Sequence, residues 1–322
     1  MGVFFIGRQD VCISRILAMR HFVTLDDIQT AELHQIFKIA QQIKAEVKSG
    51  LRKPLLAGKT IAMIFEKQSL RTRVSFEAGM TQLGGNSMFL GADVGFGKRE
   101  STADFSRVLS SMVDAIVFRS IKHESIVEMT RYATCPVINA LSDAAHPCQA
   151  LADLMTMKEE FGDWKGLKLA WVGDSNNVAV SIVRICAKLG VRLSIASPKG
   201  YDFDPETLKC LVGPNPGDGF HLEKTTDPVE AVQDANAVYT DVWVSMGQEA
   251  EEAERKRIFA PYRVNESLMA KAGKDCIFLH CLPAKRGQEV TDGVMDSPQS
   301  RIVAQAENRM HAQKGLLVWL LH

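Results

Sequence analysis

The stretch TIAMIFEKQSLRTRVSFEAGMTQLGG, residues 60–85, contains an apolar run, a basic turn and an amphipathic segment in direct succession. Its first six residues are apolar or β-branched, which predicts a buried strand. Apolar residues then recur at helical spacing (Phe76, Met80, Leu83) and two glycines supply a stop, so residues 69–73 should open a helix. A buried strand followed directly by a helix is the building unit of an α/β fold.

Similar apolar runs alternate with amphipathic segments along the rest of the chain, as expected for a parallel sheet covered by helices. We therefore expect two doubly wound α/β domains, each a central parallel sheet flanked by helices, with a C-terminal helix packing back on the first domain. The runs are AIVFR (115–119), LKLAWVG (167–173), RLSIAS (192–197), NAVYTDVW (236–243) and CIFLHCLP (276–283). The expected divisions are an extension at 1–18, a first domain at 19–150, a second at 151–302 and the returning helix at 303–322.

Composition excludes several classes of protein. In 322 residues, 38 Lys and Arg balance 38 Asp and Glu, so no overall basic field favours nucleic acid. Seven cysteines without a CxxC pair argue against a disulfide framework and predict a cytoplasmic protein. No apolar run approaches the roughly 18 residues that span a bilayer. Because MRHFVTLDDI from Met19 resembles a fresh start, residues 1–18 read as an upstream extension, with a transit peptide as the alternative.

The two arginines of SLRTR (69–73) sit at the predicted start of a helix, where free N–H groups and the helix dipole favour an anion. The alternative is an exposed helix start whose arginines pair with Glu66 and Glu77. Other polar motifs favour the anion site, because they also follow predicted strands or lie on the last helix, and open α/β sheets hold ligands at such strand ends. They are Arg119, HPCQ (146–149), HCLP (280–283) and ENR (307–309).

The order S-x-R-T-R, H-P-x-Q, H-C-L-P resembles the carbamoyltransferases, which move a carbamoyl group from carbamoyl phosphate to an amine. The resemblance runs from about Met19 to the C-terminus. GDSNN (173–177) and DVWVSMG (241–247) are similar to the acceptor segments of the members that use ornithine. The resemblance implies a homotrimer that binds carbamoyl phosphate and L-ornithine and makes citrulline, without a cofactor. No histidine is paired with a carboxylate at metal-ligand spacing, so we expect no metal, and His280 should be structural.

The resemblance also assigns roles by residue. Those implied for the phosphate are Ser69, Leu70 through its backbone N–H, Arg71 and Thr72. Those implied for the carbamoyl end are Arg119, His146, Gln149, Cys281, Leu282 and Arg309. Those implied for ornithine are Asn177, Asp241, Ser245 and Met246. Since a side-chain amine with a pKa near 10.4 is neutral in only roughly one molecule in a few thousand at pH 7, Asp241 and Cys281 are expected to manage its proton.

Two positions depart from the family pattern. Leu70 replaces the usual first threonine of the basic motif, which should weaken phosphate binding without abolishing it, because the backbone donor remains. Gly95 stands where ornithine-using members often carry a glutamine or histidine that reaches a neighbouring subunit. Lys98, in the same loop, is the candidate to supply a cation across the interface; the alternative is a solvated loop.

Three other functions are compatible with part of this pattern. The acceptor could be an N-acylated ornithine or putrescine, or the chain could be a relative that binds carbamoyl phosphate without catalysis. A dehydrogenase is disfavoured because residues 173–177 lack G-x-G-x-x-G and no acidic residue closes the next strand.

Overall fold

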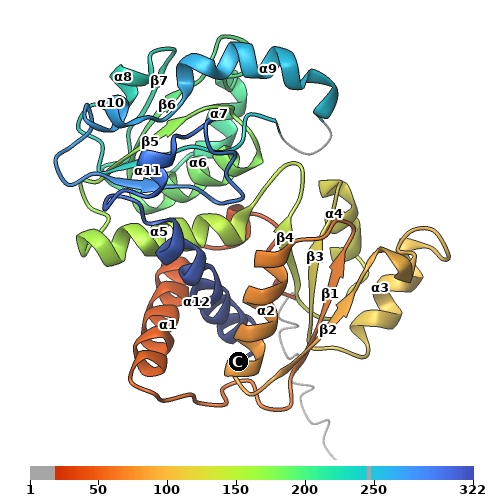
Figure 1. The fold of residues 1–322 in the computed structure, drawn as a ribbon. Coiled ribbons are helices and arrows are strands. Elements are labelled where there is room, and N and C mark those ends of the chain that lie inside the picture. The colour runs from red at the N-terminus through yellow and green to blue at the C-terminus, as the bar shows by residue number, and fades with distance from the viewer. Residues whose placement is uncertain (1–18, 245–247) are drawn as a thin grey trace, which may run out of the picture.

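The computed structural model describes residues 19–244 and 248–322, which form two parallel sheets flanked by helices (Figure 1). The first sheet has the strand order β2-β1-β3-β4, and the second has the order β7-β6-β5-β8-β9. Every pairing between these strands is parallel. The expected fold of two doubly wound halves is confirmed.

The elements of the first half are α1 (Thr30–Lys48), β1 (Thr60–Phe65), α2 (Leu70–Gln82), β2 (Asn86–Leu90), α3 (Thr102–Ser110), β3 (Ala115–Arg119), α4 (His123–Thr130), β4 (Val137–Leu141) and α5 (Pro147–Phe161). Those of the second are β5 (Lys168–Val172), α6 (Asn177–Leu189), β6 (Arg192–Ala196), α7 (Pro205–Val212), β7 (Leu222–Thr225), α8 (Pro228–Val232), β8 (Ala237–Tyr239), α9 (Glu252–Phe259), α10 (Glu266–Met269), β9 (Ile277–Leu279), α11 (Asp292–Met295) and α12 (Ile302–Leu321). Short 3₁₀ helices in the described residues lie at Leu25–Asp27, Ala92–Val94, Glu249–Glu251 and Ala260–Tyr262.

The opening strand and helix form as the sequence predicts. β1 covers the whole TIAMIF run, and α2 starts at Leu70 with Ser69 as its N-cap. The helix ends at Gln82 with Leu83 as its C-cap, and the N–H groups of Gly84 and Gly85 bond back to its last carbonyls. The basic motif therefore occupies the turn between a buried strand and the positive end of a helix.

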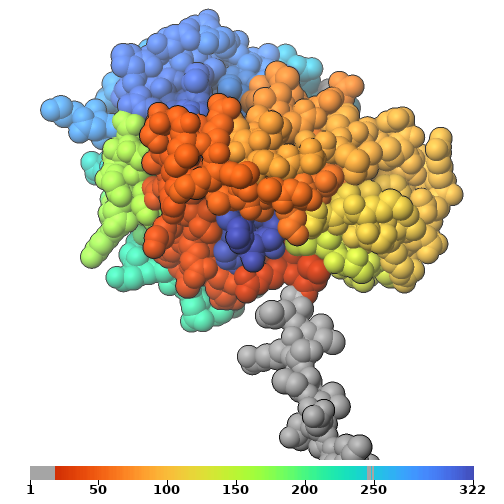
Figure 2. All heavy atoms as spheres, turned by 90° about the horizontal axis from the view of Figure 1, so that it is seen from below, coloured from red at the N-terminus to blue at the C-terminus, as the bar shows by residue number. Residues whose placement is uncertain are grey.

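The last helix returns to the first half, as expected. α12 packs against α1, α5 and α2, and the blue C-terminal end is surrounded by the red and orange N-terminal segments (Figure 2). Leu316 and Leu317 are fully buried in this contact. The packing places Arg309 of the ENR motif, in the first half of α12, beside His146 and Gln149 at the start of α5.

Residue 150, where the sequence suggests a division between domains, lies inside α5, and this helix continues without a break to Phe161. α5 crosses between the two sheets (Figure 1). The division stays a prediction, as does the extension at residues 1–18, which is outside the described residues. No helix in the described parts of the chain is both long and apolar enough to cross a membrane.

Candidate active site

A cavity of about 720 Å³ lies between the two halves, at the carboxyl ends of strands from both sheets. Parallel strands place their carboxyl ends at one edge of a sheet, so residues distant in sequence meet there. The cavity brings together most of the candidate residues: Ser69, Leu70, Arg71, Thr72, Arg119, His146, Asn177, Asp241, Cys281, Leu282 and Arg309.

One wall is the start of α2. The Ser69 side chain makes no capping hydrogen bond to the helix, and its hydroxyl bonds instead to the Thr72 hydroxyl at 3.0 Å. The first N–H groups of the helix therefore lack a side-chain cap. Arg71 lines the cavity and forms no ion pair with a described residue, whereas Arg73 turns outward to Glu77 at 2.9 Å. The wall suits an anion.

Arg119 and Arg309 add two more guanidinium groups to the same cavity. Arg119 ends β3, and burial followed by the charge of Arg309 lowers its pKa to about 10. Its Nε atom is buried without a hydrogen-bond partner among the described residues. Arg309 donates to the Thr72 hydroxyl at 3.3 Å, but its Nε is likewise unpartnered. Buried donor atoms of positively charged groups that lack a partner indicate a site for a negatively charged or strongly polar ligand.

His146 is the N-cap residue of α5 and lies beside Arg309. Burial, then the charges of Arg309 and Arg119, lower its pKa well below the usual value, so the ring is neutral at pH 7. Because Arg309 donates to Nε2 at 3.3 Å, we assign the proton to Nδ1, which is buried without a partner in the described structure. His146 therefore lines the cavity as a neutral imidazole.

Gln149 lies behind this wall. Its Oε1 accepts from Arg309 Nη1 at 2.5 Å, and its Nε2 donates to Asp153 at 2.7 Å. Both ends of the amide are therefore used by the protein. Direct binding of a ligand by Gln149 stays a prediction, and its observed contact is to the arginine.

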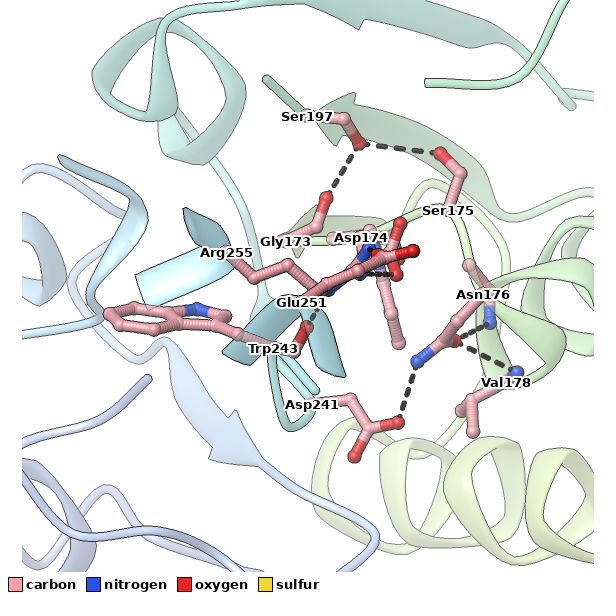
Figure 3. Close-up of polar contacts among 12 residues, drawn as sticks. Gly173, Asp174, Ser175, Asn176, Val178, Ser197, Asp241, Trp243, Glu251 and Arg255 are labelled. Atoms are coloured by element: carbon pink, nitrogen blue, oxygen red, sulfur yellow. Dashed lines mark hydrogen bonds and ion pairs between the residues drawn. The ribbon is translucent and has the colours of Figure 1, made fainter. Parts of the chain in front are cut away.

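The opposite wall comes from the second half. Asp241 follows β8, and its carboxylate accepts from Asn176 Nδ2 at 2.8 Å (Figure 3). It also accepts from Cys281 Sγ at 3.1 Å. Burial, and next the negative Asp241, raise the pKa of Cys281 well above its usual value. Cys281 is therefore a thiol rather than a nucleophilic thiolate at neutral pH.

Asn177 begins α6 and donates to the Ser142 carbonyl at 2.6 Å. Beside it, Asp174 forms a buried ion pair with Arg255 of α9, which also donates to the Trp243 carbonyl at 2.5 Å (Figure 3). Burial raises the pKa of Asp174, and Arg255 opposes that shift. The Arg255 contacts tie the chain on either side of residues 245–247 to the end of β5. The candidates Ser245 and Met246 are outside the described residues.

Asp241, His280 and Cys281 each bring one possible metal-ligand atom within 4.8 Å of the others. Sequence spacing did not reveal this cluster, because the fold supplies Asp241 from another strand. His280 Nδ1 accepts from the Leu282 N–H at 2.9 Å, and Nε2 faces Glu289 at 3.3 Å. Both ring nitrogens are thus engaged by the protein, which fits the structural role expected for His280.

Lys98 is exposed and is not one of the described residues that line this cavity. The nearby Gly95 has φ of 73°, a left-handed conformation in which a side chain is strained, and an added Cβ would meet the Arg99 side chain at 3.0 Å. The local backbone therefore explains the glycine. The structure of one chain leaves the role of Lys98 a prediction.

Sequence reasoning missed residues that act through others. Asn176 contacts Asp241, Asp153 contacts Gln149, and Arg255 contacts Asp174. Asp153 lies four residues after Gln149 on one helix face, a spacing that could have revealed it. No local signal marks Arg255, because its partner is 81 positions away.

The chain matches the carbamoyl-P binding domain of aspartate/ornithine carbamoyltransferase over residues 20–159 and the Asp/Orn binding domain over 165–320. It is 51% identical over 303 residues to an ornithine carbamoyltransferase of Anoxybacillus flavithermus, covering 94% of this chain and 96% of the relative. It is 49% identical to the anabolic ornithine carbamoyltransferase of Pyrococcus furiosus, covering 95% and 97%.

Solved structures agree. The ornithine carbamoyltransferase of Pyrococcus furiosus superposes with a TM-score of 0.89 at 49% identity, covering 95% of this chain and 98% of that one. Ornithine transcarbamoylase of Giardia lamblia superposes with a TM-score of 0.85 at 33% identity, covering 94% and 98%. Sequence, fold and the residues gathered in the cavity together place the chain in the aspartate/ornithine carbamoyltransferase family.

Proposed function

We propose that the protein transfers the carbamoyl group of carbamoyl phosphate to the side-chain amine of L-ornithine, giving L-citrulline and phosphate. The observation that carries the proposal is the polarity of one cavity. Guanidinium groups, two of them with an Nε that has no partner among the described residues, and a neutral imidazole line one wall, and a carboxylate with amide groups lines the other. A phosphate with an attached carbonyl fits the first wall, and an amino acid with a second amine fits the opposite wall.

The start of α2, with Ser69, the Leu70 N–H, Arg71 and Thr72, holds the phosphate. Arg119, Arg309 and the His146 N–H bind the carbamoyl oxygen. As the amine attacks, this oxygen gains negative charge, and preorganised donors stabilise that charge more than the ground-state carbonyl. The tetrahedral centre then collapses, the bond to the phosphate oxygen breaks and phosphate leaves.

Attack requires an uncharged amine. The positive charge of Arg119 and Arg309 disfavours a second cation close to the carbamoyl group, which lowers the pKa of a bound amine. Asp241 accepts the amine proton, and the protonated, neutral Cys281 thiol holds the Asp241 carboxylate in place. Asn177 and the Ser245–Met246 segment bind the amino-acid end.

We propose a homotrimer in the cytoplasm. In the first half, Leu70 and Val74 are exposed one turn apart on α2, and Met88 is exposed on the edge strand β2. Such an apolar face beside a sheet edge suits burial against another copy. Six cysteines in the described residues are free, which fits a reducing compartment.

The test is to incubate the purified protein with carbamoyl phosphate and, in separate reactions, L-ornithine, N-acetyl-ornithine, putrescine or L-aspartate. Carbamoylated product and phosphate are both measured. We expect product with ornithine alone. Product with another amine would support the residues assigned to carbamoyl phosphate and would contradict the residues assigned to ornithine. No product from folded protein with any amine would favour a relative that binds without catalysis.

A further inference from the structure

Asp153 is a fully buried carboxylate that the reaction described above does not use. It lies on α5 one turn after Gln149. Its Oδ1 accepts from Gln149 Nε2 at 2.7 Å and from Gln305 Nε2, on α12, at 2.6 Å. Two glutamines on different helices thus present the same end of their amides to one carboxylate.

The chemistry of these groups fixes a direction. An ionised carboxylate can only accept hydrogen bonds, so each amide must turn its NH₂ toward Asp153 and its oxygen away. The oxygen of Gln149 then faces Arg309 Nη1 at 2.5 Å, and the oxygen of Gln305 accepts from the backbone N–H of His280 at 2.9 Å. The contacts through Gln149 lead to Arg309, on the cavity wall proposed to bind the carbamoyl group. The contacts through Gln305 lead to His280, which precedes Cys281 on the wall proposed to bind the amine acceptor.

We propose that Asp153 is a positioning residue for carbamoyl transfer: its ionised carboxylate sets the orientation of Gln149 and Gln305, and through them aligns Arg309 with the His280–Cys281 segment. The inference rests on the proposed function, because it takes Arg309 to contact the carbamoyl oxygen. Reversal of the Gln149 amide would bring its NH₂ against a guanidinium N–H, and Arg309 would lose the shortest of its hydrogen bonds and keep only contacts of 3.3–3.4 Å to His146, Thr72 and Ala140.

Opposing effects of its surroundings leave Asp153 partly ionised near neutral pH. Burial raises its pKa to about 7, against the hydrogen bonds from Gln305 and Gln149 and the charge of Arg309. The titratable groups that face it are Arg309 from α12, Tyr239 from β8, Cys186 from α6 and Cys281 after β9. Burial raises the pKa of Tyr239, Cys186 and Cys281, so all three are neutral at pH 7, and Arg309 is charged.

Protonation removes the orienting effect. A protonated Asp153 is both donor and acceptor, so either end of each glutamine can face it. An asparagine has the same ambiguity and nearly the same shape. Asp153→Asn should therefore mimic the protonated enzyme at every pH.

The experiment measures kcat and KM for both substrates from pH 5.5 to 8.5 in wild type and Asp153→Asn. We expect kcat of the variant to be lower by about 10- to 100-fold at pH 8.5, the usual cost of losing an orienting partner. The ratio of the wild-type kcat to the variant kcat should fall toward one as the pH drops below about 7, where wild-type Asp153 becomes protonated. Taking the ratio cancels the titrations that both proteins share.

A thermal unfolding scan separates positioning from folding. Asp153 has a folded pKa above its unfolded value, so its ionisation costs stability as the pH rises through about 7. At pH 8.5 the variant should therefore unfold at the same or a higher temperature than wild type, while turning over more slowly. Glu160→Gln is the matched control: it is a carboxyl-to-amide change on the same helix, and its partner Arg301 immediately precedes α12, away from the cavity.

Three results would overturn the inference. An active wild type with an equally active Asp153→Asn would overturn it alone. A variant that loses stability and activity together, with a ratio of wild-type to variant kcat that does not change with pH, would show that Asp153 has only a structural role. A folded wild type that carbamoylates no amine would remove the proposed function and this inference with it.

Discussion

Asn176 donates a hydrogen bond to the carboxylate of Asp241, and its role as a helix cap fixes the direction of that bond. Its Oδ1 accepts from the N–H groups of Val178 at 3.0 Å and Ala179 at 3.1 Å, so its Nδ2 must point away from α6, toward Asp241 (Figure 3). Asn176→Ser keeps a cap acceptor and removes the donor. Losing a hydrogen bond to a charged group costs about 1.5 kcal/mol, so KM for ornithine should rise about 10-fold.

Asn176→Asp is the sharper variant. It also keeps the cap, but it replaces the Nδ2 donor with a second carboxylate oxygen that repels Asp241. The increase in KM for ornithine should therefore be larger than in Asn176→Ser. Initial rates over a range of ornithine concentrations decide this, with KM for carbamoyl phosphate as the internal control. A KM for ornithine like that of wild type in both variants would exclude Asn176 from this role.

Most of the charged residues that line the cavity were readable from sequence, and several residues that bond to them were not. Arg71, Arg119 and His146 stand in motifs at strand ends, and they meet in the cavity because parallel strands share one edge. Asn176 and Asp153 became candidates only through their hydrogen bonds to Asp241 and Gln149, which are three-dimensional contacts. Gln149 shows the difference, since the motif predicts a substrate contact and the structure shows one to Arg309.

At the scale of elements, the buried central strands were the easiest to predict. The sequence runs that predict β1 and β3 match their bounds, whereas the partly exposed edge strands β2 and β7 were missed. β7 reads LEKT, with two charged residues exposed, so it carries no apolar run. β4 was missed although it is buried, because Asn139 interrupts its apolar run.

The contact between α1 and α12 yields an element-scale prediction. A Cβ added at Gly315 would lie 2.6 Å from the Ile36 carbonyl oxygen and 3.0 Å from the Ala40 nitrogen, both backbone atoms that cannot move aside. Gly315→Ala should separate the helices and lower the free energy of unfolding by about 1–3 kcal/mol. Because Arg309 lies on the same helix, kcat should also fall.

Chemical denaturation and steady-state rates measure both effects. Val303→Ala, on the same helix at a side chain that is 77% exposed, is the matched control and should change neither. A Gly315→Ala protein with wild-type stability would show that the two helices can tolerate a wider separation.

For the whole molecule, the open question is whether a neighbouring copy completes the site. Lys98 is exposed, lies in the loop that follows the edge strand β2, and does not reach the described part of its own cavity. If it crosses to a neighbour, Lys98→Ala should weaken binding of carbamoyl phosphate, since a cation near the phosphate is lost. Arg99→Ala in the same loop is the control, and full affinity in Lys98→Ala would exclude the role.

Mixed assemblies give the decisive form of this prediction. Lys98→Ala and His146→Ala subunits each lack one half of a shared site, so each parent protein should be slow. After denaturation and reassembly of an equal mixture, a site is intact when a subunit with native His146 adjoins a neighbour with native Lys98. Random assembly into closed rings makes about one quarter of the sites intact, so about a quarter of the wild-type rate should return. A mixture that runs only at the mean of its parents would show that each chain uses its own residues alone.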